Sequence, residues 1–94
     1  APLMELKWTS KALSDLARLY DFLVLASKPA AARTVQSLTQ APVILLTHPR
    51  MGEQLFQFEP REVRRIFAGE YEIRYELTGQ TIYVLRLWHT RENR

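Results

Sequence analysis

The last apolar segment of the chain runs directly into residues that could do chemistry. Arg86 interrupts this segment, and Trp88, His89 and Arg91 follow at its end. A chain terminus is usually frayed and seldom carries functional side chains. An unpaired guanidinium in an apolar strand is costly, so Arg86 requires a carboxylate, a partner or solvent. These four residues are therefore the first candidates for function.

General acid-base chemistry on a phosphodiester is one reaction that these residue types allow. His89 could move a proton, while Arg65, Arg86 or Arg91 could stabilise charge in the transition state. They suffice for a metal-independent ribonuclease. A structural interpretation is equally open: Arg65 pairs with a glutamate on a neighbouring strand, Trp88 covers the core, and His89 bonds the end of the sheet.

Other chemistries lack their residues. The chain has no cysteine, and its two histidines, His48 and His89, lie far apart, so we expect no metal site. The three glycines are isolated turn residues and form no phosphate-binding loop. No Gly-x-Ser-x-Gly turn is available to present a nucleophile. We therefore expect neither a cofactor nor a small-molecule substrate.

The composition favours one folded domain. The chain has 94 residues, of which 47% are apolar and 24% charged, which is typical of a globular protein. The net charge is +3; the lysines lie in the first third, and the second half carries only arginine as its cation. The arginine guanidinium is suited to bidentate hydrogen bonds with carboxylate or phosphate. For most of these arginines we expect pairing with glutamates on neighbouring strands.

Targeting signals are missing from this sequence. No apolar run reaches the roughly 18 residues that a membrane span needs, and no basic-then-apolar signal segment precedes the domain. We therefore expect a cytoplasmic protein with no membrane partner. Met4 is a plausible start, so we expect the domain to span residues 4–94 and residues 1–3 to be additional to it.

The first half of the chain predicts a short strand and two helices. Alternation over Glu5–Thr9 predicts the strand, and Ser10 is a suitable N-cap for a helix from Lys11 to about Ala26. A second helix is expected from Pro29 or Ala30 to Leu45. Pro42 should interrupt it. A connection over residues 27–29 makes the two helices a hairpin.

The second half has a period of two, which predicts strands over residues 63–68, 71–77 and 81–89. In the last strand, alternation places Ile82, Val84 and Trp88 on one face and Tyr83, Leu85 and Leu87 on the other. Both faces are apolar, so this strand should be central. The predicted fold is α+β: an N-terminal strand and a two-helix hairpin packed on a small antiparallel sheet.

The first helix carries more apolar surface than one core face requires. Phe22 and Leu25 point to its polar side, and Leu19 lies at the margin of the apolar arc. Isolated exposed apolar residues usually mean little. Large ones that gather near one helix end favour a docking surface for a partner.

Several short segments, in this order and at this spacing, resemble the RelE/ParE superfamily of toxins. The resemblance spans Met4 to Arg91 and is carried by Trp8-Thr9 before the Leu13/Leu16/Tyr20 helix, Pro49-Arg50-Met51-Gly52, Val63-Arg64-Arg65-Ile66, Tyr71-Glu72-Ile73-Arg74-Tyr75 and Ile82-Tyr83-Val84-Leu85-Arg86-Leu87-Trp88-His89. It implies a helical hairpin against an antiparallel sheet. It also implies a toxin of a type II toxin-antitoxin system of the plasmid stabilisation type.

The superfamily contains two kinds of toxin. The ParE branch poisons DNA gyrase by trapping the complex with cleaved DNA; RelE-type members cleave messenger RNA in the ribosome. The ending of this chain resembles ParE, no tyrosine follows the last strand, and the lysine-rich sheet surface of RelE is missing. The resemblance thus implies a gyrase inhibitor that is not an enzyme, with Arg86, Trp88, His89 and Arg91 contacting gyrase.

His89 keeps the alternative open, because some RNA-cleaving members use a histidine near this place. In that alternative the chain is a ribosome-dependent mRNA endonuclease with His89, Arg86, Arg65 and Arg91 as catalytic residues. A small binding module without toxicity is a third, less favoured class. The resemblance further implies a cognate antitoxin whose C-terminal segment wraps the toxin, and Leu19, Phe22 and Leu25 are the expected contacts.

Overall fold

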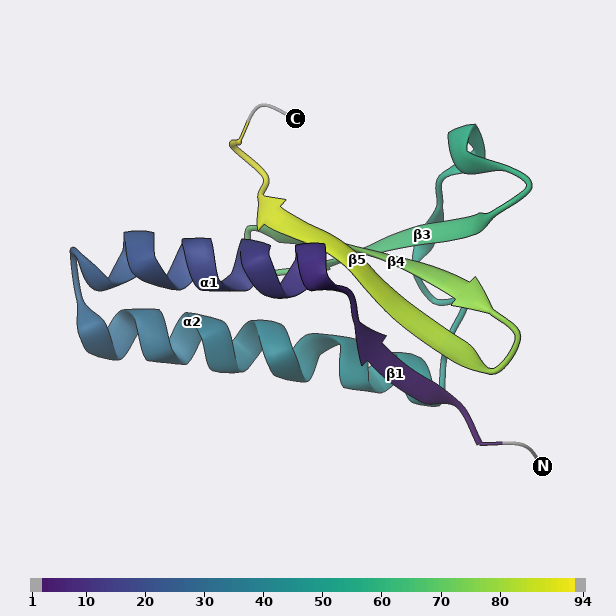
Figure 1. Cartoon of the computed structure of the whole chain (residues 1–94), viewed down its shortest axis with the longest axis horizontal. Coiled ribbons are helices and arrows are strands. Elements are labelled where there is room, and N and C mark those ends of the chain that lie inside the picture. Colours follow the sequence, from purple (N-terminus) through teal and green to yellow (C-terminus); the bar gives the residue numbers. More distant parts are fainter. Residues whose placement is uncertain (1–2, 93–94) are drawn as a thin grey trace.

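The computed structural model describes residues 3–92, in which two helices lie side by side against a five-stranded sheet (Figure 1). The fold is α+β, as predicted. The expectation about residues 1–3, and the domain end at residue 94, fall largely outside the described residues and stay predictions. Between residues 3 and 92, no helix is long and apolar enough to cross a membrane.

The first helix, α1 (Ser10–Val24), begins one residue earlier than predicted, and its N-cap is Thr9 rather than Ser10. The Thr9 hydroxyl accepts a hydrogen bond from the Ala12 N–H, which satisfies a free amide of the first turn. The same hydroxyl lies 3.0 Å from the carbonyl oxygens of both Val84 and Leu85. Thr9 therefore links the start of α1 to the sheet, a tertiary contact that selects it as the cap.

The second helix, α2 (Lys28–Gln40), follows a short connection, so the predicted hairpin is confirmed. The Ser27 hydroxyl caps it at the Ala30 N–H, and Pro29 lies in its first turn, where a missing N–H costs nothing. The predicted interruption at Pro42 is also confirmed. The chain continues as a 3-10 helix, η1 (Ala41–Leu46), instead of a longer α-helix.

The sheet has the strand order β1-β5-β4-β3-β2. Its long strands are β3 (Glu62–Ala68), β4 (Tyr71–Thr78) and β5 (Thr81–His89), which are antiparallel neighbours as predicted. β1 (Glu5–Trp8) runs parallel to β5, so the sheet is mixed and β5 is internal along that stretch. The helical hairpin supplies the long crossover connection that a parallel pair needs. A two-residue strand, β2 (Glu53–Gln54), and a 3-10 helix, η2 (Phe56–Phe58), were not predicted.

A β-bulge changes which residues of β5 face the core. Tyr75 lies opposite Val84 and Arg74 lies opposite Arg86, so Leu85 is an extra residue on β5. The predicted division of the strand is therefore wrong beyond Val84. Leu87 joins Val84 in the core beneath the helices, whereas Trp88 alternates to the other side.

The core lies between the helices and one face of the sheet. One cluster joins Ala12 and Leu38 of the two helices to Ile73, Val84 and Leu87. A second cluster contains Leu45, Tyr75, Leu77 and Ile82. The alternation predicted for β4 is confirmed, since Ile73, Tyr75 and Leu77 are all buried.

Candidate functional site

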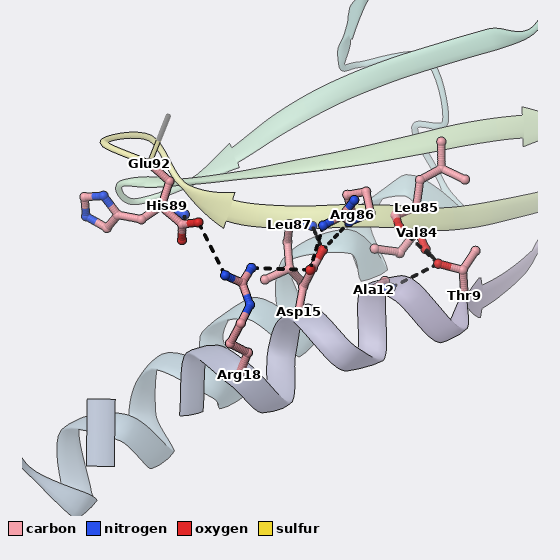
Figure 2. A network of polar contacts seen from close by, with 10 residues as sticks. All are labelled: Thr9, Ala12, Asp15, Arg18, Val84, Leu85, Arg86, Leu87, His89 and Glu92. Atoms are coloured by element: carbon pink, nitrogen blue, oxygen red, sulfur yellow. Dashed lines mark hydrogen bonds and ion pairs between the residues drawn. The ribbon is translucent and has the colours of Figure 1, made fainter. Parts of the chain in front are cut away.

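Arg86 is paired with a carboxylate from the first helix. Its Nε and Nη2 donate hydrogen bonds of 2.7 and 3.0 Å to the two carboxylate oxygens of Asp15 on α1 (Figure 2). The Leu87 N–H donates to Asp15 Oδ2 at 3.1 Å. β1 ends at Trp8, so β5 has no strand partner on this side beyond Val84. Asp15 therefore satisfies both the guanidinium and a backbone donor of the open strand edge.

The environment of Asp15 favours its charged form. The carboxyl is 5% exposed, and burial alone would raise its pKa. Hydrogen bonds from Arg86 and Leu87, together with the charges of Arg86 and Arg18, outweigh that burial and hold the pKa of Asp15 below its usual value. The hydrogen bond to Asp15 likewise raises the pKa of Arg86. The pair is thus ionised at neutral pH.

Arg18 extends this network to the tail after β5. Its Nη2 lies 3.5 Å from Asp15 Oδ1, and its Nη1 lies 3.8 Å from Glu92 Oε2 (Figure 2). The other Glu92 oxygen, Oε1, accepts a hydrogen bond of 3.3 Å from the His89 N–H. Two carboxylates, from Asp15 and Glu92, thus bind alternate backbone donors of the open β5 edge, and Arg18 connects them.

His89 is held against the end of the sheet. Its Nδ1 accepts a hydrogen bond of 3.1 Å from the Arg91 N–H, and its Nε2 lies 3.7 Å from Glu70 Oε2. Its ring meets the Tyr71 ring edge-on, with centroids 5.1 Å apart. Because Nδ1 accepts, a neutral His89 carries its proton on Nε2. The structural role considered for His89, bonding the end of the sheet, is thus realised.

A pocket of about 660 Å³ lies between the second half of α1 and the end of β5. Its apolar lining comes from α1, the end of β5 and the first residue of β4: Leu19, Phe22, Leu23, Leu87, Trp88 and Tyr71. Its polar lining is Asp15, Arg18, His89, Arg91 and Glu92. Three predicted target contacts and two predicted antitoxin contacts therefore share one pocket. Leu25, which is 84% exposed, is not among its lining residues.

Arg65 lies apart from this pocket. It is opposite Arg74 in the sheet, whereas His89 is opposite Tyr71. Arg74 and Tyr71 are three positions apart on β4, so their side chains point to opposite faces of the sheet. Arg65 is ion-paired with Glu53 at 2.9 Å and with Glu72 at 3.5 Å. The glutamate pairing expected for Arg65 is therefore confirmed, and the four residues of the ribonuclease alternative do not share one face.

Trp88 packs against a cation on the face away from the helices. The Arg74 guanidinium carbon lies 4.7 Å from the Trp88 ring centroid and 5.4 Å from that of Phe58. Arg74 also bonds Glu72 at 3.0 Å. Trp88 is largely buried, and its ring covers this face of the sheet. The same residue is among those that line the pocket.

Sequence reasoning missed Asp15, Arg18, Glu92 and Tyr71 as parts of this site. Asp15 carried one usable signal: it stands between Ala12 and Leu16 on the helix face that packs against the sheet, where an acid needs a partner. Among residues 3–92, no three His, Asp or Glu side chains are grouped so as to hold a metal ion.

Comparisons with known proteins agree with this architecture. The family model described as "ParE toxin of type II toxin-antitoxin system, parDE" matches residues 6–94. A solved structure described as the chromosomal ParDE TA system from P. aeruginosa is 28% identical, with a TM-score of 0.78 over 93% of this chain and 96% of that chain. The comparison with curated proteins gives no match.

A more distant likeness concerns the fold alone. The archaeal RelE-RelB complex from Pyrococcus horikoshii OT3 contains a chain that is 14% identical to this one, with a TM-score of 0.67. The likeness covers 98% of this chain and 100% of that chain. The helical hairpin on a sheet is therefore common to both.

Proposed function

This chain belongs to the ParE toxin family of type II toxin-antitoxin systems, and from that premise we propose that it inhibits DNA gyrase by trapping the enzyme's complex with cleaved DNA. The observation that carries the proposal is the family match over residues 6–94, which includes the whole end of β5. The chain then acts by binding rather than by catalysis. Its place of action is the cytoplasm, where gyrase meets DNA.

The proposed contact surface is the end of β5 and the residues that follow. Arg91 is the most accessible member, with 84% of its side chain exposed. Trp88 and His89 stand beside it in the pocket lining. Arg86 is held by Asp15, so its main contribution is to keep this end of β5 in position against α1. Exposed arginine beside an aromatic ring is well suited to protein recognition.

A cognate antitoxin neutralises the toxin in this proposal by filling the pocket. Phe22 is 67% exposed and lines the pocket together with Leu19 and Trp88. A segment bound there also covers His89 and Arg91. The solved relatives are described as a ParDE system and a RelE-RelB complex, which supports a partner of this kind.

RNA cleavage of the RelE type has less support. Arg65 is ion-paired on the opposite pleat of the sheet, and His89 Nδ1 accepts a backbone hydrogen bond. Neither residue has the shared access to a phosphodiester that general acid-base catalysis requires.

A supercoiling assay tests the proposal. Purified toxin is incubated with gyrase, ATP and relaxed plasmid, and the products are separated after denaturation of the protein. We expect inhibited supercoiling and accumulation of linear DNA from trapped complexes. No inhibition and no linear DNA would overturn the proposal. Ribosome-dependent cleavage of a transcript that is lost in His89→Ala would favour the RelE-type alternative.

A further inference from the structure

Glu92 occupies a small carboxylate site at the end of β5. One oxygen lies 3.8 Å from the Arg18 guanidinium, and the other accepts the His89 N–H at 3.3 Å. The site therefore combines a cationic side chain with a strand-edge backbone donor, and this is the combination that binds carboxylates strongly. Figure 2 shows both contacts at the turn that follows the strand.

The chain supplies this carboxylate from a position that can exchange. Glu92 closes the turn that begins at His89, with its own N–H donating to the His89 carbonyl at 2.9 Å. The Arg18 and His89 contacts of Glu92 are at the long end of their ranges, and the Arg18 side chain is 57% exposed. An ion pair this exposed is easily broken. Asp15 differs, because it is buried and accepts three hydrogen bonds of 3.1 Å or less from Arg86 and Leu87.

The site borders the apolar pocket, so one ligand can enter both. Arg18 and Glu92 line the pocket together with Leu19, Phe22 and Trp88. A segment that places a large apolar side chain in the pocket therefore brings its neighbouring residue close to Arg18. The polar side of that segment meets the unpaired edge of β5, whose donors already bind carboxylates.

The charge around the site selects an acidic ligand. Once Glu92 has left, the three cations Arg18, Arg86 and Arg91 face the two carboxylates of Asp15 and Glu70, which leaves a net positive charge at the site. When Glu92 moves out, Arg18 and the His89 N–H both lose their contact with its carboxylate. A partner carboxylate restores both interactions and adds favourable charge complementarity.

We infer that an acidic residue of the antitoxin displaces Glu92 from Arg18 and from the His89 N–H. An adjacent apolar side chain of the antitoxin then fills the pocket. The inference rests on the proposed function for the identity of the partner. It specifies the chemistry of the bound segment: a large apolar residue next to Asp or Glu.

The test uses the cognate antitoxin, which is sought in the reading frame next to that of the toxin, and measures its dissociation constant with toxin variants by calorimetry. Glu92→Gln removes the negative charge of the internal competitor, so binding should tighten by about threefold to tenfold. Arg18→Gln should weaken binding about tenfold or more. In the Arg18→Gln background, Glu92→Gln should give no further gain, because both changes act on one site.

Glu70→Gln is the matched control. Glu70 lies 3.7 Å from His89 and 3.9 Å from Arg91, so the change removes one negative charge in the same neighbourhood. Glu70 contacts His89 at the ring Nε2, whereas Glu92 accepts from the His89 N–H. Equal gains from Glu70→Gln and Glu92→Gln would overturn the displacement and indicate general electrostatics. An unchanged or weaker affinity in Glu92→Gln would also overturn it.

These outcomes separate the inference from the proposed function. If the wild-type toxin binds the neighbouring protein and Glu92→Gln has no effect, the inference fails and the antitoxin assignment stands. If no binding occurs at all, both fail, while gyrase inhibition is decided by the supercoiling assay. Amide hydrogen exchange gives a second readout: His89 should exchange faster in free Glu92→Ala, which lacks the acceptor, and regain protection in the complex.

Discussion

Asp15 and Arg86, which are 71 positions apart in the chain, form a bidentate ion pair that connects α1 to β5 just after its bulge. The same carboxylate binds the Leu87 N–H. The other proposed gyrase contacts, Trp88, His89 and Arg91, follow this point in the chain. The position of the recognition surface therefore depends on Asp15, a residue of the first helix.

Removing this carboxylate should destabilise the fold. Asp15→Ala leaves the Leu87 N–H and the partly buried Arg86 guanidinium without their acceptor, and we expect a loss of about 2–3 kcal/mol. Asp21→Ala, at an exposed position of the same helix, is the control and should change stability by less than about 0.5 kcal/mol. Urea unfolding measures both; equal effects would contradict the role given to Asp15.

Stability should fall in acid partly through Asp15. Its pKa is lowered in the folded protein, so the folded state binds its proton less readily than the unfolded chain. The stabilisation is then complete above the unfolded pKa, near pH 4, and is lost as the pH falls through the lower folded value. Glu62, whose pKa is lowered in the same direction by Arg50 and Arg64 against the effect of burial, adds to this loss.

Comparing Asp15→Ala with the wild type isolates this contribution. The free energy of unfolding of the variant, measured in urea from pH 6 to pH 2.5, should depend less steeply on pH below about 4. Parallel curves for the two proteins would show that the Asp15 pKa is not lowered by folding.

Phe22 and Leu25 should differ in antitoxin binding, although both are exposed apolar residues near the end of α1. Phe22→Ser removes part of the pocket lining and should weaken binding about tenfold or more. Leu25→Ser changes a residue outside that lining and should change affinity less than about threefold. Thermal unfolding of each variant checks that the fold persists. Equal losses would place the antitoxin contact outside the pocket.

Arg91 should contribute to gyrase inhibition without contributing to folding. Its side chain is 84% exposed, and its guanidinium lies 3.9 Å from the exposed Glu70, so Arg91→Gln should leave stability nearly unchanged. We expect about tenfold more variant to be needed for equal inhibition of supercoiling. Arg61→Gln removes the same charge near the opposite end of β4, where Arg61 bonds Glu76, and should inhibit like the wild type. Full activity of Arg91→Gln would remove Arg91 from the contact surface.

Local sequence patterns were sufficient for most of the fold. Apolar periodicity predicted α1 and the alternation of β4, and Pro42 predicted the interruption after α2. These features are decided by residues within a few positions of one another, through backbone propensity and hydrophobic pattern.

Contacts between distant residues decided the rest. The bulge at Leu85 depends on how β5 pairs with β4, and it moved Leu87 into the core and Trp88 to the other side. Thr9 became the helix cap because it also lies beside β5.

The sequence by itself determined the elements, their order and the residue types gathered at the end of the chain. Only the tertiary structure decided that Asp15 holds Arg86, that Arg65 lies apart from His89, and that Phe22 shares a pocket with Trp88. The physical reason is that a carboxylate, a pleat position or a pocket wall acts through space. Strand register and helix packing set those distances, and no local pattern encodes them.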